Sequence, residues 1–177
     1  VLLLPWASAL LVALFPKPLF SISLSAVFSV AALYFCTTAP VDFKIAYPWF
    51  NLGGQSLNAS FWANASAQLV LGLVALVSFC VQLFSKSYLA KDPSIGRYYV
   101  YLHLFVGAMT LLLLTDSVFL FYGAWELVGA CSYLLISFWH QKQAATQAAK
   151  KAFLINRLGD IALLFGLIGL GLHFNTW

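Results

Sequence analysis

The stretch SVFLFYGAWELVGACSYLLISFW, residues 117–139, decides the fold class of this chain. It is apolar or weakly polar throughout, except for one carboxylate, Glu126, near its middle. A helix of about 20 apolar residues crosses the ~30 Å hydrocarbon core of a bilayer. This stretch is therefore long enough to span a membrane as one helix.

The composition of the whole chain gives the same answer. Of its 177 residues, 63% are hydrophobic and only 8% are charged, and its mean hydropathy is +0.92. A soluble domain carries about 25% charged residues. Soluble globular, disordered, collagen-like and disulfide-scaffold classes are excluded, and an integral membrane protein remains.

The other long apolar stretches predict a polytopic all-α bundle of about six transmembrane helices in one domain, residues 1–177. Small and hydroxyl side chains recur at helical spacing, as at Ser21, Ser25 and Ser29, which allows close helix approach and favours a packed bundle. The chain starts at Val1 without a methionine and stops just after an apolar segment, so we expect a portion of a larger subunit. The expected spans are residues 1–15, 19–35, 68–84, 98–114, 117–139 and 153–174.

Two connections carry secondary structure of their own. In the long one, residues 37–66, apolar Phe43, Ile45 and Tyr47 alternate with other residues, and Gly53-Gly54 supplies a turn. This pattern predicts a short β-hairpin over the bundle. The Ala- and Gln-rich segment 140–151 predicts a short amphipathic helix leading into the last span.

Basic residues are distributed unevenly between the two sides of the expected bundle. Seven fall in the first, third and fifth connections, whereas Lys44 is alone on the opposite side. The positive-inside rule places the basic side in the cytoplasm or in the mitochondrial matrix. The seven are Lys17, Lys86, Lys91, Arg97, Lys142, Lys150 and Lys151.

Glu126 is the foremost candidate for chemistry. A charged carboxylate near the middle of a span costs about 2.5–3.5 kcal/mol on insertion scales, so it must find a cationic or hydrogen-bonding partner or hold a proton. Desolvation raises the pKa of a carboxyl group and a nearby cation lowers it, so such a group could take up and release a proton. Gly129, Ala130, Tyr133 and Ser137 continue its helix face and could line a hydrated path. The alternative is a structural ion pair between helices.

Further polar candidates lie near the expected last span and in the fourth. Arg157 and Asp160 are three residues apart and can pair on one helix face, and Lys150 lies two turns earlier. They could form a polar relay with Glu126, or simply anchor the start of a helix. His103 could relay protons or be a packing residue with satisfied hydrogen bonds.

No motif for a bound cofactor is present. The sequence has no Gly-rich phosphate loop, no C-x-x-C pair and no His/Cys metal cluster. Cys36, Cys80 and Cys131 lie in or beside apolar segments and are interpreted as small core residues. We therefore expect no nucleotide, metal, haem or iron–sulfur centre in this chain, and its scattered basic residues predict no nucleic-acid partner.

Two strings are specific enough to point to a family. They are Trp125-Glu-Leu-Val-Gly-Ala-Cys-Ser-Tyr-Leu-Leu-Ile-Ser-Phe-Trp139 and Asn156-Arg-Leu-Gly-Asp160, and Tyr47-Pro-Trp49 agrees with them. From about Tyr47 onward the chain resembles subunit 5 (subunit L in bacteria) of proton-pumping NADH:quinone oxidoreductase, respiratory complex I. The resemblance implies an N-terminal portion, because the family's chains are several times longer.

The resemblance also implies roles for particular residues. Glu126 matches the family's buried carboxylate, which works with a Lys on a later helix beyond residue 177. Arg157 and Asp160 match polar residues that face the neighbouring antiporter-like subunit, and Lys150 or Lys151 matches the basic pair before them. The chain departs from the family pattern at Ala124, at His103 and in segment 64–68, where the family has Gly, Asn and an acidic residue.

These observations predict a membrane-arm subunit that contributes to proton translocation coupled to NADH:quinone oxidoreduction, an enzyme subunit without its own redox centre. NADH, FMN, iron–sulfur clusters and quinone would be bound by other subunits. Expected partners are other membrane-arm subunits, the C-terminal part of this subunit and membrane lipids. The expected location is the mitochondrial inner membrane or the bacterial cytoplasmic membrane. The alternatives are the large subunit of a multi-subunit cation/proton antiporter and a non-pumping structural fragment.

Overall fold

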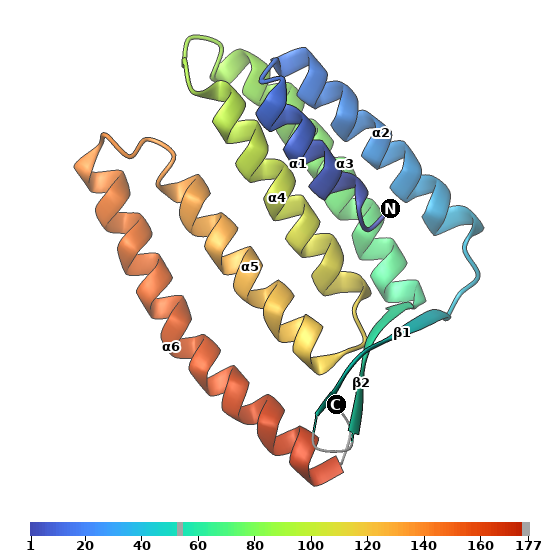
Figure 1. Ribbon diagram of the computed structural model, residues 1–177. Helices are drawn as coiled ribbons and strands as arrows, with labels where there is room; N and C mark the ends of the chain where they lie inside the picture. Colours follow the sequence, from blue (N-terminus) through green and yellow to red (C-terminus); the bar gives the residue numbers. More distant parts are fainter. Residues whose placement is uncertain (53–54, 175–177) are drawn as a thin grey trace.

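The computed structural model describes residues 1–52 and 55–174 (Figure 1). Within these ranges, six helices and one two-stranded hairpin follow one another. The elements are α1 (Leu4–Leu14), α2 (Pro18–Thr38), β1 (Phe43–Leu52), β2 (Gln55–Ala63), α3 (Ala65–Tyr88), α4 (Ile95–Leu114), α5 (Val118–Ile136) and α6 (Gln143–Phe174). The predicted helical bundle and the predicted hairpin are both confirmed.

Five of the helices, α2 to α6, are long and apolar enough to cross a membrane. The first, α1, is apolar but has only 11 residues, which is about 16 Å of helix. This length is about half of a bilayer core. The expected span over residues 1–15 is thus a shorter helix in the structure.

The last helix begins earlier than the sequence predicted. We expected a separate amphipathic helix over residues 140–151 and a span from residue 153, but α6 runs without interruption from Gln143. Apart from Thr146, residues 143–152 are strong helix formers, and no Gly or Pro interrupts them, so nothing ends the helix there. Arg157 and Asp160 therefore lie near the middle of α6, and the helix-start anchor proposed for them is wrong.

The connections fall at two opposite ends of the bundle, as Figure 1 shows. The α1–α2, α3–α4 and α5–α6 connections lie at one end, which we call the basic end, and the hairpin and the α4–α5 turn lie at the other. Helices α1 to α4 pack together as a cluster, α5 packs against α4, and α6 lies outermost against α5. The basic connections thus share one end, as the charge pattern predicted.

The α2–α3 contact is lined with small and hydroxyl side chains. Ser21, Ser25 and Ser29 are buried on α2, and Ser29 Oγ donates to the carbonyl of Ala75 on α3 at 2.9 Å. The apolar core beside this contact contains Phe28, Ala32, Leu71, Ala75, Val106 and Leu114. The serine stripe read from the sequence therefore does bring two helices together.

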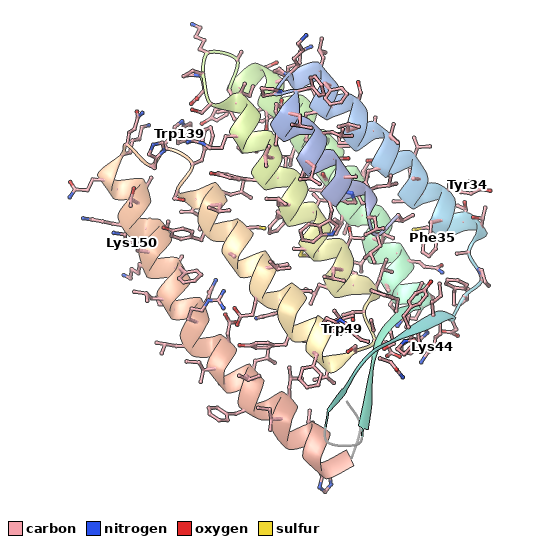
Figure 2. The ribbon with its side chains drawn as sticks, in the orientation of Figure 1. Tyr34, Phe35, Lys44, Trp49, Trp139 and Lys150 are labelled. Atoms are coloured by element: carbon pink, nitrogen blue, oxygen red, sulfur yellow. The ribbon has the colours of Figure 1, made fainter. Side chains whose placement is uncertain are left out.

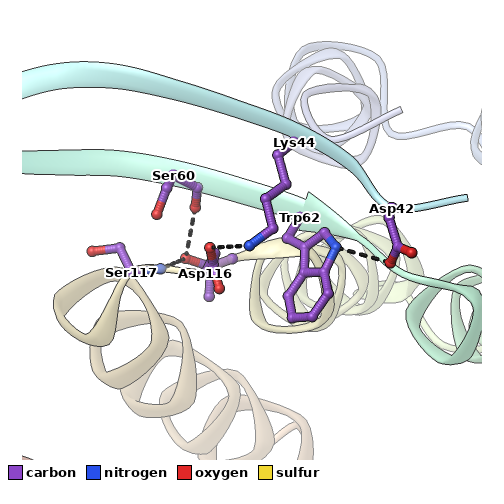
Figure 3. A network of polar contacts seen from close by, with 7 residues as sticks. Asp42, Lys44, Ser60, Trp62, Asp116 and Ser117 are labelled. Atoms are coloured by element: carbon purple, nitrogen blue, oxygen red, sulfur yellow. Dashed lines mark hydrogen bonds and ion pairs between the residues drawn. The ribbon is translucent and has the colours of Figure 1, made fainter. Parts of the chain in front are cut away.

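The hairpin is tied to the α4–α5 turn by backbone and side-chain contacts (Figure 3). The amide of Asp116 donates to the carbonyl of Ser60 at 2.9 Å, and Lys44 Nζ lies 3.3 Å from Asp116 Oδ2. Lys44 also lies 4.1 Å from the centroid of the Trp62 ring, whose Nε1 donates to Asp42. The antiparallel pairing of β1 and β2 matches the predicted hairpin. Its expected Gly53-Gly54 turn lies outside the described residues.

Close packing at Gly96 leads to a first prediction. A Cβ at Gly96 of α4 would meet the ring of Pro16 and would lie 3.3 Å from Pro16 Cα, both rigid parts of the α1–α2 connection. Gly→Ala in a helix normally stabilises by up to about 1 kcal/mol. We expect Gly96→Ala instead to destabilise the chain in detergent by about 1–3 kcal/mol, the usual cost of overpacking.

Gly166 provides the control for this prediction, because nothing lies within 4 Å of a Cβ at that position. Gly166→Ala should leave the thermal unfolding midpoint unchanged or raise it. If Gly96→Ala also raised the midpoint, the tight contact between α4 and Pro16 would be disproved.

Candidate functional site

The site is built around Arg157 on α6, which faces Glu126 on α5. Arg157 Nη1 forms an ion pair with Glu126 Oε2 and lies 3.7 Å from Asp160 Oδ2, while Nη2 donates to the backbone carbonyl of Glu126. The exposed fractions of the three side chains are 29% for Arg157, 21% for Glu126 and 9% for Asp160. Glu126 and Asp160 lie near the middle of their helices, so one guanidinium serves two carboxylates well away from the ends of α5 and α6.

Trp125 completes this group. Its indole Nε1 donates to Asp160 Oδ1 at 2.7 Å, so Asp160 is held from both sides, by Trp125 and by Arg157. The sequence interpretation did not include Trp125 in the site. The available signal was its position: a tryptophan far from the ends of a span still needs an acceptor for its N–H.

The face of α5 that continues from Glu126 lies against α6. Tyr133 packs on Phe153 with ring centroids 5.4 Å apart, and the Arg157 guanidinium lies 4.6 Å from the centroid of the same Phe153 ring. A Cβ at Gly129 would be in ordinary van der Waals contact with Arg157 Nη2, at 3.6 Å. Part of the face predicted to line a hydrated path, at Gly129 and Tyr133, therefore contacts α6.

A cavity of about 550 Å³ lies beside the site, between α4, α5 and α6. Polar groups enter its mainly apolar wall from Ser132, Asn156 and Asp160, and Trp125 also lines it. Arg157 Nε is buried and has no hydrogen-bond partner among residues 1–52 and 55–174. The site is thus only partly enclosed and keeps an unused donor.

Formal charge does not balance at the site. With every group ionised, Glu126, Asp160 and Arg157 sum to −1. Charges in a low-dielectric interior are stable only when paired. The group therefore has the capacity to hold one proton, or to pair with one further cation.

Lys150 and His103 do not join this group. Lys150 is exposed, points away from the bundle in Figure 2 and precedes Arg157 by two turns of α6. In the described part of the chain no carboxylate lies within ion-pair distance of its ammonium.

His103 belongs to a different buried cluster. Its Nε2 lies 3.0 Å from Ser21 Oγ and 3.5 Å from Gln82 Nε2, which links α4 to α2 and α3. Ser21 Oγ also donates to Gln82 Oε1 at 3.0 Å, and the Tyr99 hydroxyl donates to the Gln82 carbonyl. His103 thus links three helices through Nε2, and among the described residues no hydrogen bond connects this cluster to Glu126.

No group of three or more His, Cys, Asp or Glu side chains that could hold a metal ion occurs within the described ranges. None of the three cysteines forms a disulfide. Cys131 is buried and Cys80 is exposed. Cys36 is half-buried, and its thiol donates a hydrogen bond to the carbonyl of Gln68.

Two family models match this chain. Residues 49–99 match complex I chain 5 N-terminus, and residues 115–176 match the transmembrane family of NADH:quinone oxidoreductase and Mrp antiporters. The second match contains Trp125, Glu126, Arg157 and Asp160, so the whole site lies within it.

Curated relatives carry the names of one subunit. The chain is 36% identical over 150 residues to NAD(P)H-quinone oxidoreductase subunit 5 of the Paulinella chromatophora chromatophore, covering 85% of this chain and 22% of that protein. It is 35% identical over 182 residues to NADH-quinone oxidoreductase subunit L of Rickettsia conorii, covering 95% of this chain and 27% of that one. The chain thus spans about a quarter of the length of these relatives.

A solved structure, the Mrp complex from Dietzia sp., contains a chain with the same fold. The TM-score is 0.86 at 26% identity, over 99% of this chain and 19% of that one. Sequence and fold therefore agree, and the chain is a homologue of the N-terminal part of NADH-quinone oxidoreductase subunit 5, also named subunit L.

Proposed function

We propose that this chain is part of a membrane-arm subunit of respiratory complex I and contributes to proton translocation coupled to NADH:quinone oxidoreduction. The observation that carries the proposal is the charge of the site: two carboxylates, Glu126 and Asp160, share one cation, Arg157, near the middle of two membrane-capable helices. The names of the relatives supply the reaction to which the movement of charge is coupled.

The geometry suggests how the site works. Arg157 contacts both carboxylates, so a small displacement of its guanidinium toward Asp160 would leave Glu126 without a cation. An unpaired carboxylate inside a membrane is costly, which favours uptake of a proton. Return of Arg157, or approach of a Lys from the longer subunit, would favour its release. Glu126 is the proton-loading group in this scheme, and Arg157 and Asp160 set its charge state.

Lys150 and His103 have more distant roles in the proposal. Lys150 lies on the same helix toward the basic end and would extend the polar route from Arg157 to that surface. His103 would act in a separate relay through Ser21 and Gln82. NADH, FMN, iron–sulfur clusters and quinone belong to other subunits of the complex, and the neighbours of this chain are antiporter-like subunits and the remainder of its own subunit.

Purification of the native assembly tests the proposal. We expect this chain to copurify with subunits that carry flavin and iron–sulfur clusters, and with NADH-dependent quinone reduction. The fold match to the Mrp complex makes a cation/proton antiporter the second candidate. Copurification with membrane subunits only, together with sodium-dependent proton exchange, would favour that candidate and contradict the proposal.

Labelling of single cysteines tests the expected orientation, with the basic end in the cytoplasm or the matrix. The background variant lacks Cys36, Cys80 and Cys131. Because basic connections stay on the inner side, we expect Lys91→Cys and Lys142→Cys to react with a membrane-impermeant maleimide only in inverted vesicles. Asn58→Cys on β2, at the opposite end, is the matched control and should react only in right-side-out vesicles. The reverse pattern would contradict the orientation.

A further inference from the structure

A group of cationic and polar side chains outside the proton site gathers at the basic end. Arg97 in the first turn of α4 meets His140 in the α5–α6 connection, with Arg97 Nη2 3.4 Å from His140 Nδ1. The Arg97 guanidinium lies 5.8 Å from the centroid of the Phe138 ring, and Arg97 and His140 are both exposed. Among the residues described, no carboxylate lies within ion-pair distance of Arg97.

The contact between Arg97 and His140 determines which donors remain. Arginine has only N–H donors and no acceptor, so Nδ1 of His140 must accept and the ring proton must be on Nε2. The pair therefore keeps the His140 Nε2–H and the other N–H groups of Arg97 available for an acceptor. Two neighbouring donors with no carboxylate in ion-pair contact among the described residues are suited to an anion.

A cleft next to this pair provides space for one. It has a volume of about 130 Å³ and is lined by Arg97, Tyr101, Ser137, Phe138 and His140, so its wall contains two hydroxyls and no carboxylate.

A second cleft, of about 110 Å³, shares Arg97 and His140 but also contains Asp92. The Asp92 carboxylate already accepts from Trp139 Nε1 at 2.9 Å and from the amide of Ser94 at 2.8 Å. The bond from Trp139, then that from Ser94 and the charge of Arg97 hold the pKa of Asp92 below its usual value. Asp92 therefore stays negative and disfavours an anion in the second cleft, which leaves the first.

We propose that the cleft between Arg97, Tyr101, Ser137 and His140 binds the phosphate group of an acidic phospholipid. The cleft lies where α4 begins and α5 ends, at the depth of lipid headgroups if the helices span the membrane. Trp139, labelled at this end in Figure 2, and Tyr101 are aromatic residues of the kind that occupy the membrane interface. Basic pockets between transmembrane helices bind anionic headgroups, and the guanidinium fork fits phosphate oxygens.

The net charge of the lipid is part of the proposal. Lys142 lies 4.6 Å from the centroid of the Trp139 ring, and Lys91 is nearby in sequence to Asp92. These cations outnumber Asp92 around the two clefts. A lipid with an uncompensated phosphate charge, such as phosphatidylglycerol, is therefore favoured over zwitterionic phosphatidylcholine.

Native mass spectrometry of the full 177-residue chain in detergent tests the site. We expect phosphatidylglycerol to be retained more strongly than phosphatidylcholine. Arg97→Gln should weaken binding of phosphatidylglycerol by about tenfold, because hydrogen bonds to charged groups contribute that order of affinity. The affinity of Arg97→Lys for phosphatidylglycerol should lie between those of the parent and Arg97→Gln, because lysine keeps the positive charge but lacks the paired N–H donors of the guanidinium.

Lys86→Gln is the matched control. Lys86 is an exposed basic residue at the same end but does not line either cleft. Its loss should change binding by less than about twofold, as is usual for exposed charges. Equal losses in Lys86→Gln and Arg97→Gln would indicate general surface attraction and overturn the site.

Two further outcomes would also overturn the proposal. The first is equal retention of phosphatidylglycerol and phosphatidylcholine. The second is displacement of the lipid by inorganic phosphate at equal concentration, which would show a site for free anions. Should Arg97→Gln fail to keep the helical circular dichroism of the parent, His140→Phe, which removes a donor but keeps the ring, must show the same loss of phosphatidylglycerol for the site to stand.

Discussion

Glu126→Gln should lower NADH-driven proton translocation by about tenfold or more while the subunit still assembles. The amide has nearly the shape of the carboxyl and can still accept a hydrogen bond from Arg157, so packing between α5 and α6 should survive. It cannot take up or release a proton, and groups that transfer protons typically contribute at least this factor. The measurement is the response of a pH-sensitive dye in vesicles driven by NADH, normalised to assembled complex.

Two variants sharpen this result. Glu126→Asp keeps the charge one methylene further from Arg157 and should retain more activity than Glu126→Gln. Asp116→Asn removes a carboxylate in the α4–α5 turn, where it pairs with exposed Lys44, and should leave translocation unchanged. Full translocation by Glu126→Gln would reduce Glu126 to a structural hydrogen-bonding residue and would support the reading of a non-pumping fragment.

The elements that were predicted well from the sequence are those with a clear local signal. Apolar length gave α2 to α5 within a few residues, and alternation in segment 43–47 gave the hairpin. The start of α6 was missed because hydropathy marks where a helix is apolar, and not where it begins. The first turns of α6 are polar and precede its apolar segment. Their residues still have high helix propensity, so they belong to the same helix.

Glu126, Arg157 and Asp160 could be singled out from the sequence, but Trp125 and the contacts between α5 and α6 could not. The cost of a carboxylate in a membrane singled out Glu126, and spacing along one helix paired Arg157 with Asp160. The direct contact between Glu126 and Arg157 crosses from α5 to α6 and depends on their relative rotation and height, which no local pattern encodes. The same holds for the bond from Trp125 to Asp160.

Arg157→Gln should be the most damaging substitution for stability. It leaves Glu126 and Asp160 without their shared cation; breaking a fully buried pair costs about 3–5 kcal/mol, and this partly buried pair should cost up to that amount. We expect a large fall in the thermal midpoint of the chain in detergent and a loss of assembled complex. Lys150→Gln is the control on the same helix; because Lys150 is exposed, it should cost less than about 0.5 kcal/mol.

The double variant Glu126→Gln/Arg157→Gln separates an ion pair from mere packing. If the damage in Arg157→Gln comes from uncompensated carboxylates, removing one of them should restore part of the stability, and the coupling between the two positions should reach about 0.5–3 kcal/mol. Asp160 would remain, but it keeps the bond from Trp125 Nε1 and is the carboxylate better able to stay without a cation. If the stability losses of the two single variants simply add in the double variant, Arg157 stabilises the chain through its contact with Phe153 and the volume of its side chain. The charge argument for the site would then fail.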